Sequence, residues 1–119
     1  MSEKLIIKKQ DGVGWLTLDK PEKRNAICFE MWQGLQESLL AFSRDDEIRV
    51  VVLNGAGDHG FSAGADISEF PEQLSSQHAI ASYQAVIRAA LDALDDLSKP
   101  SIAMLHGLCI GGGASIALH

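Results

Sequence analysis

A chain of 119 residues, 46 % of them hydrophobic and 22 % charged, has the composition of an ordinary globular protein. Its formal net charge of −6, from 16 acidic and 10 basic side chains, excludes the positive surface that a nucleic acid or an anionic membrane would require. The two cysteines, Cys28 and Cys109, fit neither a metal-binding nor a redox spacing, and no segment is typical of a signal peptide or a membrane span. We therefore expect a cytoplasmic protein with no nucleic-acid or membrane partner.

The chain begins with a strand pair and an amphipathic helix. Residues 5–9 and 13–18 are short β-rich segments, and the Asp11-Gly12 dipeptide between them favours positive φ, which predicts a hairpin. Apolar side chains then recur at helical spacing over residues 28–42 and predict one buried stripe. The members of this stripe are Cys28, Met31, Trp32, Leu35, Leu39 and Phe42.

Strands and helices then alternate. Residues 48–53 are nearly all β-branched and apolar, which predicts a strand buried on both faces. A second amphipathic helix is expected over about 76–97, and a further strand over 102–105. Residues 114–119 start another helix with no signal that ends it, so we expect more of the protein to follow. The order ββ-α-β-α-β is typical of an α/β fold.

Two glycine-rich segments, residues 55–66 and 107–113, each connect a predicted strand to a predicted helix. Glycine allows the main chain to approach a ligand closely, and the free N–H groups at a helix start are positively polarised. Two such segments facing each other could direct two N–H donors at one carbonyl oxygen and stabilise negative charge that develops on it.

A dinucleotide site is one alternative, because residues 55–60 fit the pattern G-x-G-x-x-G after a strand. That motif should open a helix at once and be followed about 20 residues later by an acidic residue at the end of a second strand. Here that later region is the helix around Tyr83, so the context disagrees.

A serine nucleophile is a second alternative, because residues 113–117 nearly match the nucleophile elbow G-x-S-x-G. Ala117 replaces the final glycine, and a packing role inside a helix is favoured for Ser115. The four histidines have no metal-ligand spacing, so no metal site is expected. For Asp66 and Glu69, capping of a short helix after Ala65 is favoured over catalysis.

Several motifs, in this order and spacing, resemble the crotonase (enoyl-CoA hydratase/isomerase) superfamily over essentially the whole chain. The serine-alanine-glycine-alanine-aspartate-isoleucine segment combined with the downstream triple glycine is the most specific pair. The matching segments are Lys20-Pro21, Arg24-Asn25-Ala26-Ile27, Phe61 to Ile67, Lys99-Pro100, His106-Gly107 and Gly111-Gly112-Gly113.

The resemblance implies a crotonase-like core of repeated ββα turns forming a superhelix, of which residues 1–119 would be the N-terminal part of a single domain. It also implies assembly into homotrimers or hexamers. The thioester carbonyl of an acyl-CoA would sit between the backbone N–H groups of Ala65 and Gly112. No separate cofactor is implied, because coenzyme A is part of the substrate.

The resemblance assigns the coenzyme A portion of the substrate to three parts of the chain. These residues are Arg24, Asn25, Ala26, Ala63, Gly64, Ala65, Asp66, Ile67, Leu108 and Gly112. One departure concerns the position two residues after the triple glycine, where hydratases of the family typically carry a glutamate that acts on water. Ser115 occupies it here, and a serine hydroxyl is too weakly basic to replace a carboxylate as general base.

We therefore expect an enzyme that stabilises a thioester enolate, with isomerase or other non-hydratase chemistry favoured by Ser115. The catalytic carboxylate would then lie after His119. The alternative is a non-catalytic acyl-CoA-binding or assembly subunit that kept the pocket and lost its acid and base groups.

Overall fold

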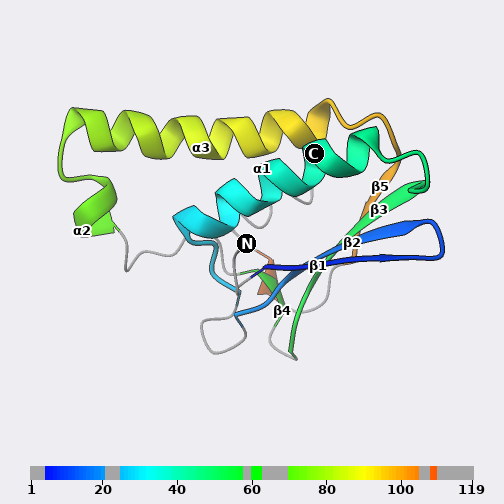
Figure 1. Cartoon of the computed structure of the whole chain (residues 1–119). Coiled ribbons are helices and arrows are strands. Elements are labelled where there is room, and N and C mark those ends of the chain that lie inside the picture. The colour runs from blue at the N-terminus through cyan, green and yellow to red at the C-terminus, as the bar shows by residue number, and fades with distance from the viewer. Residues whose placement is uncertain (1–4, 21–24, 58–59, 63–69, 105–107, 110–119) are drawn as a thin grey trace.

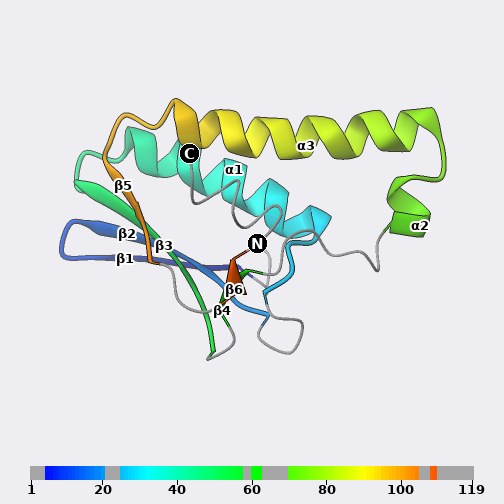
Figure 2. The same cartoon turned by 180° about the vertical axis from the view of Figure 1, so that it is seen from behind.

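The computed structural model describes residues 5–20, 25–57, 60–62, 70–104 and 108–109. Two long helices lie side by side on one face of a four-stranded sheet, and two short strands form a separate pair near one end of that sheet (Figures 1 and 2). This layered arrangement confirms the α/β class predicted from the order of elements.

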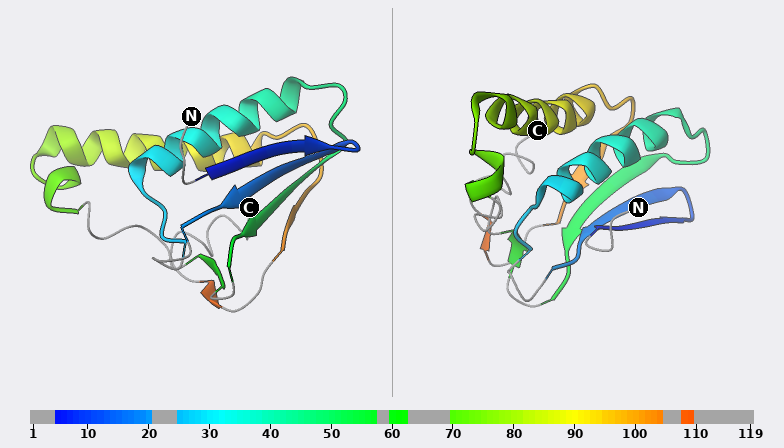
Figure 3. Two further views of the ribbon diagram at one scale, coloured as in Figure 1. Left: turned by 60° about the horizontal axis from the view of Figure 1, so that its bottom comes forward. Right: turned by 60° about the vertical axis from the view of Figure 1, so that its left-hand side comes forward.

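The sheet has the strand order β1-β2-β3-β5. Its strands are β1 (Leu5–Gln10), β2 (Val13–Leu18), β3 (Val50–Gly55) and β5 (Ser101–Ala103). The predicted hairpin is confirmed: β1 and β2 are antiparallel, and Asp11 and Gly12 between them have φ values of 53° and 82°. The pairs β2–β3 and β3–β5 are parallel, so β2 and β3 end together, with Leu18 opposite Gly55. Figure 3 shows the strands side by side below the helices.

The helices are α1 (Phe29–Arg44), the short α2 (Phe70–Gln73) and α3 (Gln77–Asp95). The Ser76 side chain caps α3 by accepting a hydrogen bond of 3.0 Å from the Ala79 N–H. Both predicted long helices are confirmed, and all six residues of the predicted α1 stripe are buried. The indole of Trp32, 1 % exposed, is packed among side chains of α1, α3 and β3, and no partner for its N–H is found among the described residues.

The core lies between the helices and the near face of the sheet. It joins Leu16, Leu18, Val51 and Leu53 to the buried side chains of α1 and α3. Gly14 of β2 belongs to this face, and a Cβ there would come within 2.7 Å of two ring atoms of Phe42. The absence of a side chain at Gly14 therefore lets α1 lie close to the sheet.

The far face of the sheet has no helix over it in the described part of the chain, yet β3 has buried side chains on both faces, as its sequence predicted. Val52 points to that face and is still only 7 % exposed, because Trp15 and Ile102 flank it in register on the neighbouring strands. Ile102 and Ile6 are 53 % and 44 % exposed. Strand neighbours, rather than a second helix layer, thus account for the burial of Val52.

Polar contacts tie α1 to the hairpin end of the sheet. The Lys99 ammonium donates to the Phe42 carbonyl oxygen at 2.7 Å and to the Asp45 carbonyl oxygen, so it caps the C-terminus of α1. The Lys9 ammonium contacts the Asp45 and Glu47 carboxylates at 3.0 and 2.6 Å. This hairpin-end cluster (Lys9, Asp45, Glu47, Lys99) lies far from the end where β2 and β3 finish.

Candidate functional site

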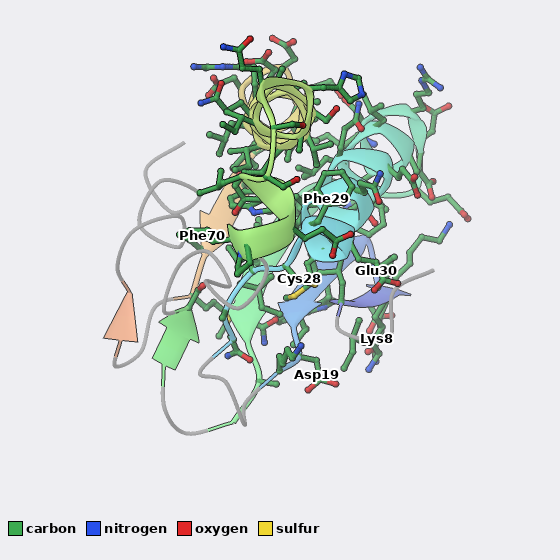
Figure 4. All side chains as sticks on the ribbon, turned by 90° about the vertical axis from the view of Figure 1, so that its left-hand side faces the viewer. Lys8, Asp19, Cys28, Phe29, Glu30 and Phe70 are labelled. Carbon is green, nitrogen blue, oxygen red and sulfur yellow. The ribbon has the colours of Figure 1, made fainter. Side chains whose placement is uncertain are left out.

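The two strands outside the main sheet are the feature that organises the candidate site. They are β4 (Gly60–Ser62) and β6 (Leu108–Cys109), which pair in parallel, with Gly60 opposite Leu108 and Ser62 opposite Cys109. Two residues of β4 thus span one step of β6, so the register shifts between Gly60 and Ser62. In Figure 4 the two arrows lie next to each other, on the side of the molecule away from the sheet hairpin.

This pairing brings the two glycine-rich segments, residues 55–66 and 107–113, together, because each contains one of the two strands. The rest of the first segment follows Ser62 and the rest of the second follows Cys109, and these two residues are partners in the register. The two predicted donors then follow at equal distance along the chain, because Ala65 is three residues after Ser62 and Gly112 is three residues after Cys109.

Asn25 is the hub of the hydrogen bonds around these strands. Its backbone has φ of 57°, a left-handed conformation that asparagine tolerates better than most residues. The Asn25 N–H donates to the Lys20 carbonyl oxygen at 2.8 Å, and its side-chain Oδ1 accepts from the Lys20 N–H at 2.9 Å. These two bonds close the loop between β2 and α1 at its base.

The same asparagine connects this loop to the two segments that follow it in the chain. Its Nδ2 donates to the Ala56 carbonyl oxygen at 2.9 Å, just after β3, and its own carbonyl oxygen accepts from the Ser62 hydroxyl at 2.8 Å. The Ala56 N–H in turn donates to the Leu18 carbonyl oxygen at 2.8 Å. Asn25 is 1 % exposed and Ser62 is 0 % exposed, so the hydrogen bond between them is buried, whereas the bonds of Asn25 to Lys20 and Ala56 are partly buried.

Several predicted site residues lie outside the described residues. They are Arg24, Ala63, Gly64, Ala65, Asp66, Ile67, Gly112 and Ser115, and Glu69 also belongs to this group. Asn25, Ala26 and the backbone of Leu108 are described. The structure brings Asn25 together with β4, and β4 with Leu108, so these predicted positions gather at one end of the molecule.

Sequence patterns did not predict a role for Ser62. Strands β4 and β6 have three and two residues, too few for a period of two to be recognised. The residue was visible as part of the family-like motif, but its buried hydroxyl bond to Asn25 joins positions 37 residues apart. Only the three-dimensional contact identifies it.

An aromatic group holds α2 beside the start of α1. The Tyr83 ring stacks on Phe29 with centroids 6.4 Å apart, and Phe70 meets it edge-on at 6.3 Å. Figure 4 shows Phe29 and Phe70 on this side of the molecule, with Cys28 closer to the sheet. The group fixes where the chain re-enters the helix layer after residue 69.

Two open hollows lie away from the paired strands. A groove of about 280 Å³ between β1 and α1 carries Glu30 and Glu37, an acidic pair unsuited to the phosphates of coenzyme A. A hollow of about 290 Å³ on the far sheet face is lined partly by Ile6, Lys8 and Trp15. Within the described residues, no three potential metal ligands cluster together.

The pKa shifts found belong to the hairpin end. Hydrogen bonds to Glu47 and then to Asp45 raise the pKa of the Lys9 ammonium above its usual 10.5. The hydrogen bond from Lys9, followed by that from the Glu47 N–H, lowers the pKa of the Asp45 carboxyl below its usual 3.8. The hub around Asn25 instead consists of neutral groups, so its described contacts supply orientation rather than an acid or a base. In the parts of the chain described, no helix is long and apolar enough to cross a membrane.

Comparison with known proteins relates this arrangement to acyl-CoA enzymes. The family model described as enoyl-CoA hydratase/isomerase matches residues 8–119. Carnitinyl-CoA dehydratase of Salmonella arizonae is 36 % identical over 99 % of this chain and 44 % of its own length. Mitochondrial enoyl-CoA hydratase of Pongo abelii is 36 % identical over 92 % of this chain and 36 % of its own length. Human mitochondrial 3-hydroxyisobutyryl-CoA hydrolase is 29 % identical over 99 % of this chain and 31 % of its own length.

Solved structures agree with these relatives. An enoyl-CoA hydratase/carnitine racemase from Magnetospirillum magneticum superposes with a TM-score of 0.92 at 35 % identity, over 98 % of this chain and 44 % of that one. An enoyl-CoA hydratase from Mycobacterium avium gives 0.85 at 30 % identity, over 99 % and 45 %. The chain thus spans less than half the length of these proteins, and its fold is that of the crotonase enzymes. It belongs to the enoyl-CoA hydratase/isomerase family of the crotonase superfamily.

Proposed function

We propose that the protein carrying this chain is an acyl-CoA enzyme that stabilises a thioester enolate with the backbone N–H groups of Ala65 and Gly112. The observation that carries the proposal is the register of β4 and β6, in which Ser62 lies opposite Cys109. The two donors follow these partners at the same offset of three residues. Two segments that leave parallel partners and bear donors at equal offsets are well suited to direct both N–H groups at one oxygen.

The chemistry needs donors that are already oriented before charge develops. An enolate oxygen gains negative charge in the transition state, and fixed N–H groups in a site shielded from water stabilise that charge without reorganising. Backbone donors suit this task because they are held by the fold rather than by a mobile side chain. The neutral, buried hub at Asn25 supports this proposal, since it fixes the base of the first donor segment with hydrogen bonds of 2.8 to 2.9 Å.

For the coenzyme A portion, we propose binding along Arg24, Ala26 and the segment 63–67, as the family resemblance implies. Each of the three relatives described above acts, by its name, on a coenzyme A thioester. Their reactions differ, however, so membership of the family leaves the reaction open. The homotrimeric or hexameric assembly and the cytoplasmic location stay predictions, and two of these relatives are mitochondrial by name.

For the reaction type, we propose isomerisation or another conversion that does not activate water at position 115. Hydration needs a base to take a proton from water and an acid to deliver one to carbon, each contributing typically about 10² to 10⁴-fold. Ser115 can orient water but cannot deprotonate it, whereas isomerisation needs one proton carrier together with the oxyanion donors. Side-by-side assays of crotonyl-CoA hydration and 3-enoyl-CoA isomerisation test this, in wild type and in Ser115→Glu. Wild-type hydration at about 10² s⁻¹ or above, the range of efficient enzymes, would contradict it.

The oxyanion assignment is tested by removing one donor. Gly112→Pro lacks the N–H, and we expect turnover to fall by roughly 10²-fold or more, as for other oxyanion donors. Gly112→Ala is the matched control, because it keeps the N–H while adding a side chain. Unchanged turnover in a folded Gly112→Pro protein refutes the assignment. Calorimetric titration adds a test of ligand class: acyl-CoA should bind and NADH should not.

A further inference from the structure

We infer that Asn25 and Ser62 are positioning residues, which set where the first donor segment stands against the loop between β2 and α1. This inference rests on the proposed function, because it concerns the segment that carries Ala65. Neither side chain needs to touch the substrate for this role. Both are almost completely buried, at 1 % and 0 % exposed, and their described contacts are with the chain itself.

The contacts join three segments at one residue. Asn25 holds the loop at Lys20 through its N–H and its Oδ1, and it holds the end of β3 at Ala56 through its Nδ2. Its carbonyl oxygen receives the Ser62 hydroxyl at 2.8 Å, at the last residue of β4. Asn25 therefore connects the loop that carries Arg24 and Ala26 to Ser62, the residue that directly precedes segment 63–67.

The left-handed backbone conformation of Asn25 makes this set of contacts possible. With φ of 57°, the residue turns the chain so that its carbonyl oxygen meets Ser62 while its side chain reaches Lys20 and Ala56. A buried carbonyl, amide or hydroxyl that loses its partner is destabilising, so this set of contacts favours one arrangement. The arrangement is consequently well defined at Ser62.

Ser62 lies only three residues before Ala65 in the chain, so a shift of Ser62 moves the point from which the donor segment starts. A displacement of about 1 Å in a reacting geometry can cost roughly 10²-fold in rate. Loss of the Ser62 hydroxyl should therefore appear in the chemical step. Binding of coenzyme A, whose contacts are spread over many residues, should be affected far less.

The test uses the full-length protein with Ser62→Ala and, separately, Asn25→Gly. Glycine keeps the positive φ at low cost and removes both side-chain bonds. Thr17→Val is the matched control, because it removes a partly buried hydroxyl bond of 2.6 Å, from Thr17 to Asn54, on the far face of the sheet. Each variant is measured for thermal unfolding, for kcat and KM with whichever thioester the wild type converts, and for binding of free coenzyme A and of acetoacetyl-CoA, which enolises readily.

We expect kcat to fall about 10-fold to 100-fold in Ser62→Ala and Asn25→Gly, with the tighter binding of acetoacetyl-CoA reduced in parallel. Affinity for free coenzyme A should stay close to wild type, and Thr17→Val should keep kcat. Unchanged kcat in the two variants overturns the inference. So does a fall in Thr17→Val of the same size, or a loss of coenzyme A affinity with kcat retained. If wild-type protein binds acetoacetyl-CoA no better than free coenzyme A, the proposed function itself fails instead.

Discussion

The two ends of the central sheet are held by different kinds of contact. At the hairpin end, the ammonium groups of Lys9 and Lys99 hold the C-terminus of α1, and the Lys9 side chain is 43 % exposed. At the other end, neutral groups around Asn25 make the described contacts, and the Asn25 and Ser62 residues themselves are nearly inaccessible to water. The strength of charged contacts in water depends on salt and pH, whereas the strength of buried neutral hydrogen bonds depends mainly on how well donor and acceptor are aligned. The stability of the end with the candidate site should therefore depend less on salt and pH than that of the hairpin end.

The largest expected difference between the two ends of the sheet comes from Asn25→Ala, which tests the neutral contacts at the site end. Alanine loses both side-chain bonds, leaves the Lys20 N–H and the Ala56 carbonyl oxygen without this partner, and is strained at φ of 57°. We expect a loss of about 3 to 4 kcal/mol in unfolding free energy from these combined terms. Urea unfolding at low and high salt measures it, and the loss should be the same at both. A loss that shrinks with salt would contradict the neutral character of this end.

At the hairpin end, Lys99→Met tests the cap of α1. Methionine keeps much of the apolar stem but leaves the Phe42 and Asp45 carbonyl oxygens without the ammonium. We expect a loss of about 1.5 to 3 kcal/mol, the range for hydrogen bonds to charged groups. Denaturant unfolding gives the value, with Lys8→Met as an exposed control. Equal stability of Lys99→Met and wild type would show that the cap contributes nothing.

Between the two ends, apolar packing sets the distance from α1 to the sheet. Gly14→Ala places a Cβ 2.7 Å from two Phe42 ring atoms, so we expect a cost of about 1 to 3 kcal/mol from overpacking. The double variant Gly14→Ala with Phe42→Leu should recover part of this cost. Additive losses in the double variant would show that the two side chains do not interact.

The smallest effect is expected from Asp45→Asn, which tests the pH dependence of the hairpin end. The pKa of Asp45 is lowered in the folded protein, so its stabilising contribution is present above its unfolded value near 3.8 and is lost as pH falls through the folded pKa. The pKa of Lys9 is raised, so its contribution is present below 10.5 and is lost as pH rises through the folded pKa. Thermal unfolding across pH should show a slightly weaker decline below pH 4 in the variant. If the variant and the wild type lose stability identically below pH 4, Asp45 does not contribute to the acid sensitivity of the protein.

Sequence patterns predicted the helix and sheet layers well, because those layers follow from periodicity. The stripe from Cys28 to Phe42 repeats often enough to place α1 within a residue or two, and Asp11-Gly12 identifies the hairpin. Strand β3 was expected to begin at residue 48 and begins at Val50, a shift typical of strand boundaries.

The contacts of the candidate site could be predicted less well from sequence periodicity. Its glycine segments were recognised, but the β4–β6 pair consists of strands too short to carry a period, and the bond from Ser62 to Asn25 joins distant positions. The place of Asn25 along the coenzyme A tunnel stays a prediction, whereas its side-chain bonds to Lys20 and Ala56 were not predicted from the sequence. The Ala65 and Gly112 assignment stays a prediction that the register of the short strands supports.

The placement of the two tryptophans gives the chain a pair of built-in optical reporters. Trp32 is buried among α1, α3 and β3 with no described partner for its indole N–H, whereas Trp15 lines the hollow on the far face of the sheet. Their fluorescence should therefore differ in emission wavelength and in quenching by a water-soluble quencher. In Trp15→Phe protein, the emission of Trp32 would report changes in the packing of the helices on the sheet. In Trp32→Phe protein, the emission of Trp15 would report changes in the environment of the opposite face. The two faces of one sheet can thus be observed separately in solution.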